Sequence, residues 1–120
     1  MEADRLNIQE VKDYCLNKLG AFEDFPFGTE PLVIKVASKI FAIITKNSIS
    51  LKCDPFVAQN LRNQYSSVKP GYHLNKSHWN TVYLEGEIPD SEISWMIDHS
   101  YDLVYSKLRK SEKETVTRLF

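Results

Sequence analysis

The sequence predicts an α+β fold of two layers, in which an antiparallel sheet carries its helices on one face. Three β-rich runs follow one another within residues 32–53 and are separated only by short turns. Segments with apolar residues at helical spacing lie before and after these runs. Helices and strands do not alternate one for one, as they would in a parallel sheet. The expected order of elements is α-β-β-β-α-β-β-α.

The first helix is expected over residues 7–19. Asn7 precedes Glu10 by three positions, which is typical of a capped helix start, and Gly20 is placed to end the helix. Apolar side chains recur along one face at Val11, Cys15 and Leu19. This stripe is predicted to pack on the core.

Residues 21–31 contain two prolines and three phenylalanines, which predicts an ordered loop held to the core by its aromatic rings. The sequence Phe25-Pro26-Phe27-Gly28 also admits a second interpretation. Exposed phenylalanines beside a rigid proline would suit docking into a partner protein.

Residues 32–37, 40–45 and 48–53 are expected to form a three-stranded meander with turns at Ser38-Lys39 and Lys46-Asn47. The middle run is apolar on both sides, as a central strand would be. In the third run one parity is apolar and the other polar, with Ile49, Leu51 and Cys53 alternating with Ser48, Ser50 and Lys52. This alternation predicts a sheet with one buried and one wet face.

Asp54 and Pro55 predict the start of a second helix, which should end near Tyr65 and carry Phe56 and Leu61 on one face. Residues 81–86 are predicted to be a strand, and residues 72–74 are a candidate to pair with it. The last helix should begin at Pro89-Asp90, with an apolar stripe at Ile93, Ile97, Tyr101, Val104 and Leu108. The polar tail from Arg109 either continues this helix or frays.

The chain has 120 residues with 15 Lys and Arg against 16 Asp and Glu, and 42% of its residues are hydrophobic. This composition predicts one domain over residues 1–120. No stretch approaches the roughly 20 apolar residues of a membrane-spanning helix, and Glu2 and Asp4 are unlike the start of a signal peptide. A cytoplasmic protein without membrane contact is expected. Cys15 and Cys53 are expected to be buried thiols, with no metal or other cofactor.

Charge is distributed unevenly along the chain. Residues 31–84 contain seven basic residues and one acidic residue, whereas both flanking parts are net acidic. Cations, imidazoles and aromatic rings gather in residues 69–80, which include Lys69, Tyr72, His73, Lys76, His78, Trp79 and Asn80. Aromatic faces beside cations are typical of single-strand binding, and loop cations alone would serve a duplex. The same residues also fit a plain structural role, with the aromatic rings at the edge of the core.

Catalysis is not expected. His73 and His78 are five residues apart across a turn, without an obvious third metal ligand, and no nucleophile or phosphate-loop motif is present. Asp98 and His99 are adjacent on a helix and therefore point about 100° apart, so they do not form a relay. The chain is therefore expected not to be an enzyme.

Several segments in order resemble the MmcQ/YjbR family: Phe25-Pro26-Phe27-Gly28, residues 36–41, residues 51–55, residues 70–82, and residues 100–104. The resemblance covers nearly the whole chain and is most specific in residues 70–82. It implies an antiparallel two-layer fold similar to type III secretion chaperones and to frataxin-like (CyaY-like) proteins. Proteins similar to this one are commonly labelled DNA-binding, and the family offers no catalytic residues to carry over. A dedicated duplex binder is often strongly basic, whereas this chain is slightly acidic.

Two functional hypotheses follow. The first is a DNA- or other nucleic-acid-binding domain that contacts its ligand through Lys35, Lys52, Lys69, His73, Lys76, His78 and Trp79. If Val82 and Leu84 face the helices, Trp79 and Tyr83 lie on the open sheet face with the lysines. The second is a protein-interaction or homodimeric, chaperone-like module, which exposed apolar residues on the last helix or around Phe27 would favour. A small-molecule site would need a polar pocket near His73 and His78.

Overall fold

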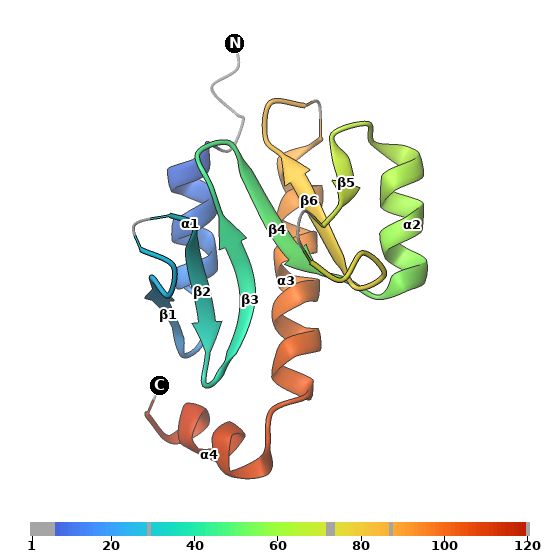
Figure 1. Ribbon diagram of the computed structural model, residues 1–120. Helices are drawn as coiled ribbons and strands as arrows, with labels where there is room; N and C mark the ends of the chain where they lie inside the picture. The colour runs from blue at the N-terminus through green and yellow to red at the C-terminus, as the bar shows by residue number, and fades with distance from the viewer. Residues whose placement is uncertain (1–6, 29, 72–73, 87, 120) are drawn as a thin grey trace.

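The structure is a computed structural model that describes residues 7–28, 30–71, 74–86 and 88–119. It contains four helices, namely α1 (Ile8–Leu16), α2 (Pro55–Gln64), α3 (Asp90–Ser106) and α4 (Lys110–Leu119). Its strands are β1 (Ala21–Asp24), β2 (Leu32–Val36), β3 (Lys39–Ile44), β4 (Ser48–Lys52), β5 (Val68–Pro70) and β6 (Trp79–Tyr83). The strands form one antiparallel sheet in the order β1-β2-β3-β4-β6-β5 (Figure 1). The predicted α+β fold class is confirmed.

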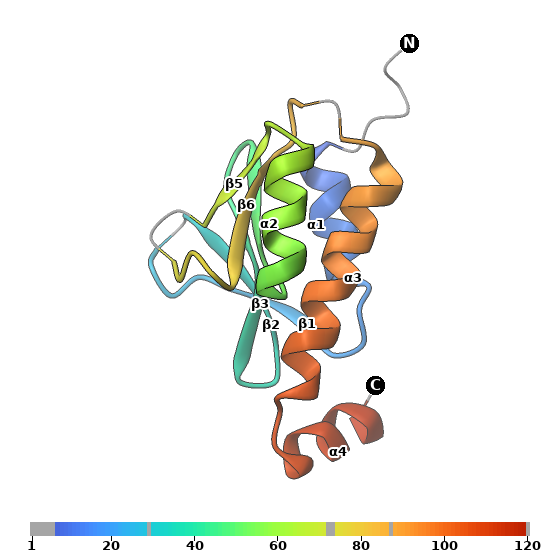
Figure 2. The same ribbon diagram turned by 90° about the vertical axis from the view of Figure 1, so that its right-hand side faces the viewer.

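Three helices cover one face of this sheet and leave the other face open (Figure 2). α3 packs across β2, β3 and β4, while α1 lies over β1 and β3, and α2 over β5 and β6. The strands turn one parity of apolar side chains toward the helices, including Ile34, Phe41, Ile49, Leu51 and Val82. Each fully buried aliphatic side chain contributes roughly 1.5–3 kcal/mol. This core fixes which face of the sheet remains available to a ligand.

The predicted helix starts are confirmed. Asn7 and Glu10 form a reciprocal capping box at α1, and the Asp54 carboxylate accepts from two backbone N–H groups at the start of α2. α1 ends earlier than predicted, at Leu16, so Leu19 lies beyond the helix and is 44% exposed. Phe56 was also wrongly assigned to a packing face, because its side chain is 75% exposed.

The segment predicted as a loop after α1 begins with an edge strand. β1 pairs in antiparallel register with β2, with Ala21 opposite Val36 and Asp24 opposite Val33. Its own residues favour strand only weakly, but the neighbouring β2 supplies a complete ladder of partners, and acidic side chains suit an exposed edge. Its phenylalanines are not held to the core: Phe22, Phe25 and Phe27 are 44%, 51% and 69% exposed.

The strand that pairs with β6 on its outer side is β5, which lies just before the candidate segment 72–74 in the chain. Val68 stands opposite Val82, Lys69 opposite Thr81 and Pro70 opposite Asn80. Pro70 is tolerated because β5 lies at the sheet edge, where one side of the backbone needs no ladder partner. Residues 72 and 73 lie outside the described part of the chain.

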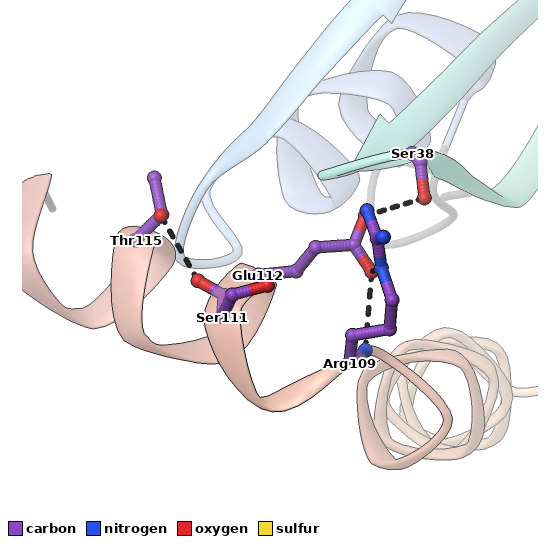
Figure 3. A network of polar contacts seen from close by, with 5 residues as sticks. All are labelled: Ser38, Arg109, Ser111, Glu112 and Thr115. Carbon is purple, nitrogen blue, oxygen red and sulfur yellow. Dashed lines mark hydrogen bonds and ion pairs between the residues drawn. The ribbon is translucent and has the colours of Figure 1, made fainter.

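The polar tail after α3 forms a separate helix. The chain turns after Ser106, and α4 lies beneath the β2–β3 hairpin (Figure 1). Val116 is buried, and the Ser38 hydroxyl donates to Glu112 Oε2 at 2.6 Å. Glu112 Oε1 also accepts from the Arg109 backbone N–H at 3.1 Å, which caps the start of α4 (Figure 3). The alternatives of a continued or frayed helix are therefore wrong.

Acid is expected to loosen α4. The hydrogen bonds from Ser38 and from the Arg109 backbone lower the pKa of Glu112 from 4.5 to about 2. The stabilisation from this carboxylate is complete above the unfolded pKa and is lost as the pH falls from about 4.5 toward 2. The protection of the α4 amides from hydrogen exchange, relative to that of the α3 amides, should fall in this window. Ser38→Ala should remove much of this pH dependence of the α4 protection. An equal loss of protection in both helices would contradict this local role.

Candidate functional site

The open face of the sheet carries a row of side chains that changes from apolar to basic. Ile43 stands opposite Ser50, Ser50 opposite Thr81, and Thr81 opposite Lys69. Because directly opposite residues point to the same face, these four side chains lie side by side across β3, β4, β6 and β5. The Ser50 and Thr81 hydroxyls are 2.8 Å apart and hydrogen-bonded.

Two aromatic residues of β6 share this face. Trp79 stands opposite Lys52, and Tyr83 opposite Ser48. Trp79 is half-buried and Tyr83 is 36% exposed. Val82 lies in the core on the helix side, so the parity predicted for Trp79, Thr81 and Tyr83 is confirmed. We call the surface formed by Lys52, Lys69, Trp79 and Tyr83, between which Thr81 is buried, the open-face platform.

Of the predicted cations, Lys35 is already paired. Its Nζ lies 3.2 Å from Asp24 Oδ2 on the neighbouring edge strand. Within the described residues, neither Lys52 nor Lys69 forms an ion pair. A partnered ammonium has less charge to offer to a ligand phosphate, so the basic character of the platform rests on Lys52 and Lys69.

Residues 74–79 are held to the rest of the fold by two cations, Lys76, which was predicted to contact a ligand, and Arg62, which was not. Lys76 Nζ donates to the Gly71 carbonyl at 2.9 Å. The Arg62 guanidinium, from α2, donates to Asn80 Oδ1 at 2.7 Å and to the Trp79 carbonyl at 3.2 Å, and it also bonds the Lys76 carbonyl. Arg62 therefore positions the segment that carries Trp79, and its guanidinium is already hydrogen-bonded within the protein.

Gly71 is required for this arrangement. A Cβ at position 71 would lie 2.7 Å from Trp79 Cβ and 3.1 Å from the Trp79 carbonyl oxygen, so a side chain would push the two segments apart. The Gly71 N–H donates to that same carbonyl at 2.8 Å. The family-like Pro70-Gly71 sequence thus places Trp79 through backbone contact. His73 falls outside the described residues.

A hollow of about 410 Å³ brings Lys52, His78 and Trp79 together at the end of β4 and β6. Asn75 lines the same hollow, as does Lys107, which follows α3. We call it the end hollow. Lys107 was missed because a contact between the end of α3 and the start of β6 depends on tertiary packing. Asp54 also lines the end hollow, but its carboxylate accepts from the Phe56 and Val57 N–H groups at the start of α2. Two lysines, an imidazole and an indole then form a setting that suits a phosphate beside a stacked ring.

Cys15 and Cys53 are buried thiols, and Asp98 and His99 bond other elements of the fold. Burial raises the pKa of Cys15 to about 12 and that of Cys53 to about 11, with Asp54 adding to the latter, so neither thiol is activated. Asp98 accepts from Tyr14 and contacts Lys18, whereas His99 Nε2 accepts the Asp54 N–H at 3.2 Å. The two adjacent residues therefore serve different elements, as predicted.

No group of three or more His, Cys, Asp or Glu side chains within residues 7–28, 30–71, 74–86 and 88–119 is arranged to hold a metal ion. In that same part of the chain, no helix has the length and apolar character needed to cross a bilayer.

The fold, in which one sheet face is free of helices, defines a class of small α+β proteins with helices on one side of an antiparallel sheet. A family model described as YjbR matches residues 16–103. Uncharacterized protein YjbR of Escherichia coli K12 is 36% identical over 118 residues, covering 95% of this chain and 100% of the relative. Uncharacterized protein YbdF of Escherichia coli O157:H7 is 40% identical over 98 residues, covering 77% and 79%. The chain belongs to the YjbR family.

Solved structures agree with this assignment. A crystal structure of a Deinococcus radiodurans protein with a DUF419 domain superposes with a TM-score of 0.85 at 31% identity, covering 98% of this chain and 92% of that one. A Pseudomonas syringae protein superposes with a TM-score of 0.72 at 27% identity, covering 82% and 99%. The architecture described above is therefore shared by experimentally determined relatives.

Proposed function

We propose that the chain binds single-stranded nucleic acid on the open-face platform and the adjoining end hollow. The observation that carries this proposal is the placement of Trp79 opposite Lys52 on the sheet face that the helices leave free, with Tyr83 on the same face of β6 and Lys69 opposite Thr81 on β5. Single-strand binders combine aromatic side chains, on which bases stack, with cations that follow the phosphates. The proposal assigns no catalytic step and no cofactor.

A single strand fits this surface better than a duplex does. The bases of a duplex are already stacked on one another, so the rings of Trp79 and Tyr83 would gain nothing from them, whereas unstacked bases can lie on these rings. A duplex binder also relies on many phosphate contacts. The platform supplies Lys52 and Lys69, and the end hollow adds Lys107. The number of cations favours a ligand recognised partly by stacking.

Replacing Lys52 and Lys69 by alanine is expected to weaken binding of a fluorescein-labelled oligo-dT about tenfold at low salt. For single strands the slope of log K against log salt is about −0.7 per phosphate contact, so the slope should become shallower by about 1.4. Fluorescence anisotropy from about 50 to 200 mM salt measures both quantities. Lys39→Ala with Lys110→Ala is the matched control, because both lysines are exposed and lie off the platform.

Trp79→Ala separates stacking from charge in the same titration. It should weaken binding without changing the salt slope, since stacking on an aromatic ring releases no counterions. Alanine keeps the Cβ against which Gly71 packs. No saturable binding by the unmodified chain at the lowest salt, or equal losses in the platform and control lysine variants, would overturn the proposed function.

Exposed phenylalanines favour a second candidate, a protein-interaction module. Phe25 and Phe27 are 51% and 69% exposed, in the segment that follows β1. Large exposed aromatic rings are unfavourable in water unless a partner covers them. If a second copy of the chain is that partner, sedimentation velocity should detect dimers that Phe25→Ser with Phe27→Ser abolishes. A monomer at all concentrations would exclude self-association.

A further inference from the structure

A groove of about 590 Å³ lies on the open face over β3, β4 and β6. We call it the face groove. Phe27 and Pro31 line it on one side and Leu74 on the other, and Ile43, Ser50 and Thr81 contribute to its floor. Figure 2 shows the connections after β1 and β5 projecting on the side of the sheet away from the helices. The volume is within the usual range for small-ligand sites.

The groove combines apolar walls with a hydroxyl floor. Ser50 and Thr81 form one hydrogen-bonded pair at 2.8 Å, and Thr45 and Ser48 form a second at 2.7 Å. A hydroxyl can both donate and accept, so such a floor can satisfy the mixed donors and acceptors at the edge of a heterocycle. The ring of Tyr83 lies beside this floor and offers an aromatic surface. These groups match a planar, uncharged ligand with a polar edge.

Charge decides which part of a nucleotide would enter. Among the described residues that line the face groove, Glu30 is the one charged side chain. A phosphate inside the groove would therefore meet a carboxylate and no cation. Lys69 is directly opposite Thr81, on the neighbouring strand β5. Neighbouring strands are about 4.8 Å apart, so a phosphate attached to a ligand in the groove can reach the Lys69 ammonium.

We propose that the face groove holds one unpaired base of the bound strand, with the hydroxyl floor at the base edge and the adjoining phosphate on Lys69. This inference rests on the proposed function and adds a specific subsite to it. The charge pattern selects this occupant over an acidic peptide side chain, because the described lining of the groove holds the Glu30 carboxylate and no cation, whereas Lys69 lies just outside and matches the phosphate that adjoins an uncharged base.

Thymidine and adenosine, which carry no phosphate, are the direct probes. Added to isotope-labelled protein, either nucleoside should shift the amide resonances of Ser50, Thr81 and Tyr83 in a saturable manner. Deoxyribose 5-phosphate, which lacks a base, should leave these resonances in place. Ser50→Ala should weaken nucleoside binding several-fold, whereas Ser77→Ala, which removes an exposed hydroxyl outside the groove, should not.

The oligonucleotide titration distinguishes failure of this subsite from failure of the proposed function. If oligo-dT binds with the expected dependence on Lys52 and Lys69 but nucleosides leave the groove resonances unchanged, the subsite is overturned and the proposed function stands. If nucleosides shift the groove resonances while no oligonucleotide binds, the strand-binding function and the subsite as part of it are both overturned. Saturable shifts by both ligands, weakened by Ser50→Ala, would support the proposal.

Discussion

Replacing Ser100 by alanine is expected to lower the free energy of unfolding by about 2–4 kcal/mol. Ser100 is fully buried on α3, and its hydroxyl donates to the Phe41 carbonyl at 2.6 Å while accepting from the Lys52 N–H at 2.9 Å. The β3–β4 register ends at Ala42 opposite Leu51, so the Ser100 hydroxyl bridges the next two backbone groups. Alanine would leave both of these groups without a partner.

Urea denaturation followed by circular dichroism measures the effect. Ser106→Ala is the matched control, since its exposed hydroxyl bonds the Leu103 carbonyl of its own helix, and it should change stability by less than about 0.5 kcal/mol. An equally small effect of Ser100→Ala would mean that β3 and β4 close on each other and pair directly. Such closure would also move Lys52, whose backbone Ser100 holds.

Arg62→Ala should destabilise the chain by about 2–3 kcal/mol and release the segment that carries Trp79. The guanidinium bonds a buried amide and two backbone carbonyls across α2, β6 and residues 74–79. Alanine removes all of these donors, and Asn80, which is 2% exposed, loses the partner of its side-chain oxygen. Arg62→Lys should rescue little, because an ammonium cannot reproduce the planar fork of donors.

Hydrogen exchange of residues 74–79 and urea denaturation are the two measurements. Exchange should accelerate in that segment more than in α1, and oligo-dT binding should weaken because Trp79 is no longer held on the platform. Arg118→Ala, at an exposed arginine of α4, removes the same charge and should leave both quantities unchanged. Unaltered exchange at residues 74–79 in Arg62→Ala would show that backbone bonds alone hold the segment.

The candidate site was predictable from sequence only where it follows local alternation. The parity of Lys52 against Leu51 and of Trp79 against Val82 correctly places both side chains on the open face. Local sequence does not reveal which cations are already occupied. Lys35 is paired with an aspartate of β1, an edge strand that was not predicted because its residues have weak strand propensity. Arg62 and Lys76 bond backbone carbonyls whose positions depend on the folded chain.

By itself, the sequence determined the fold class, the starts of α1 and α2, the central place of β3 and the face that the helices cover. These features arise from residue spacing and capping groups, which act over a few positions of the chain. Only the tertiary structure decided that residues 110–119 fold back as α4, that Lys107 joins Trp79, and that a groove with a hydroxyl floor lies between two connections. These features need partners far apart in sequence, because packing and register bring such groups together.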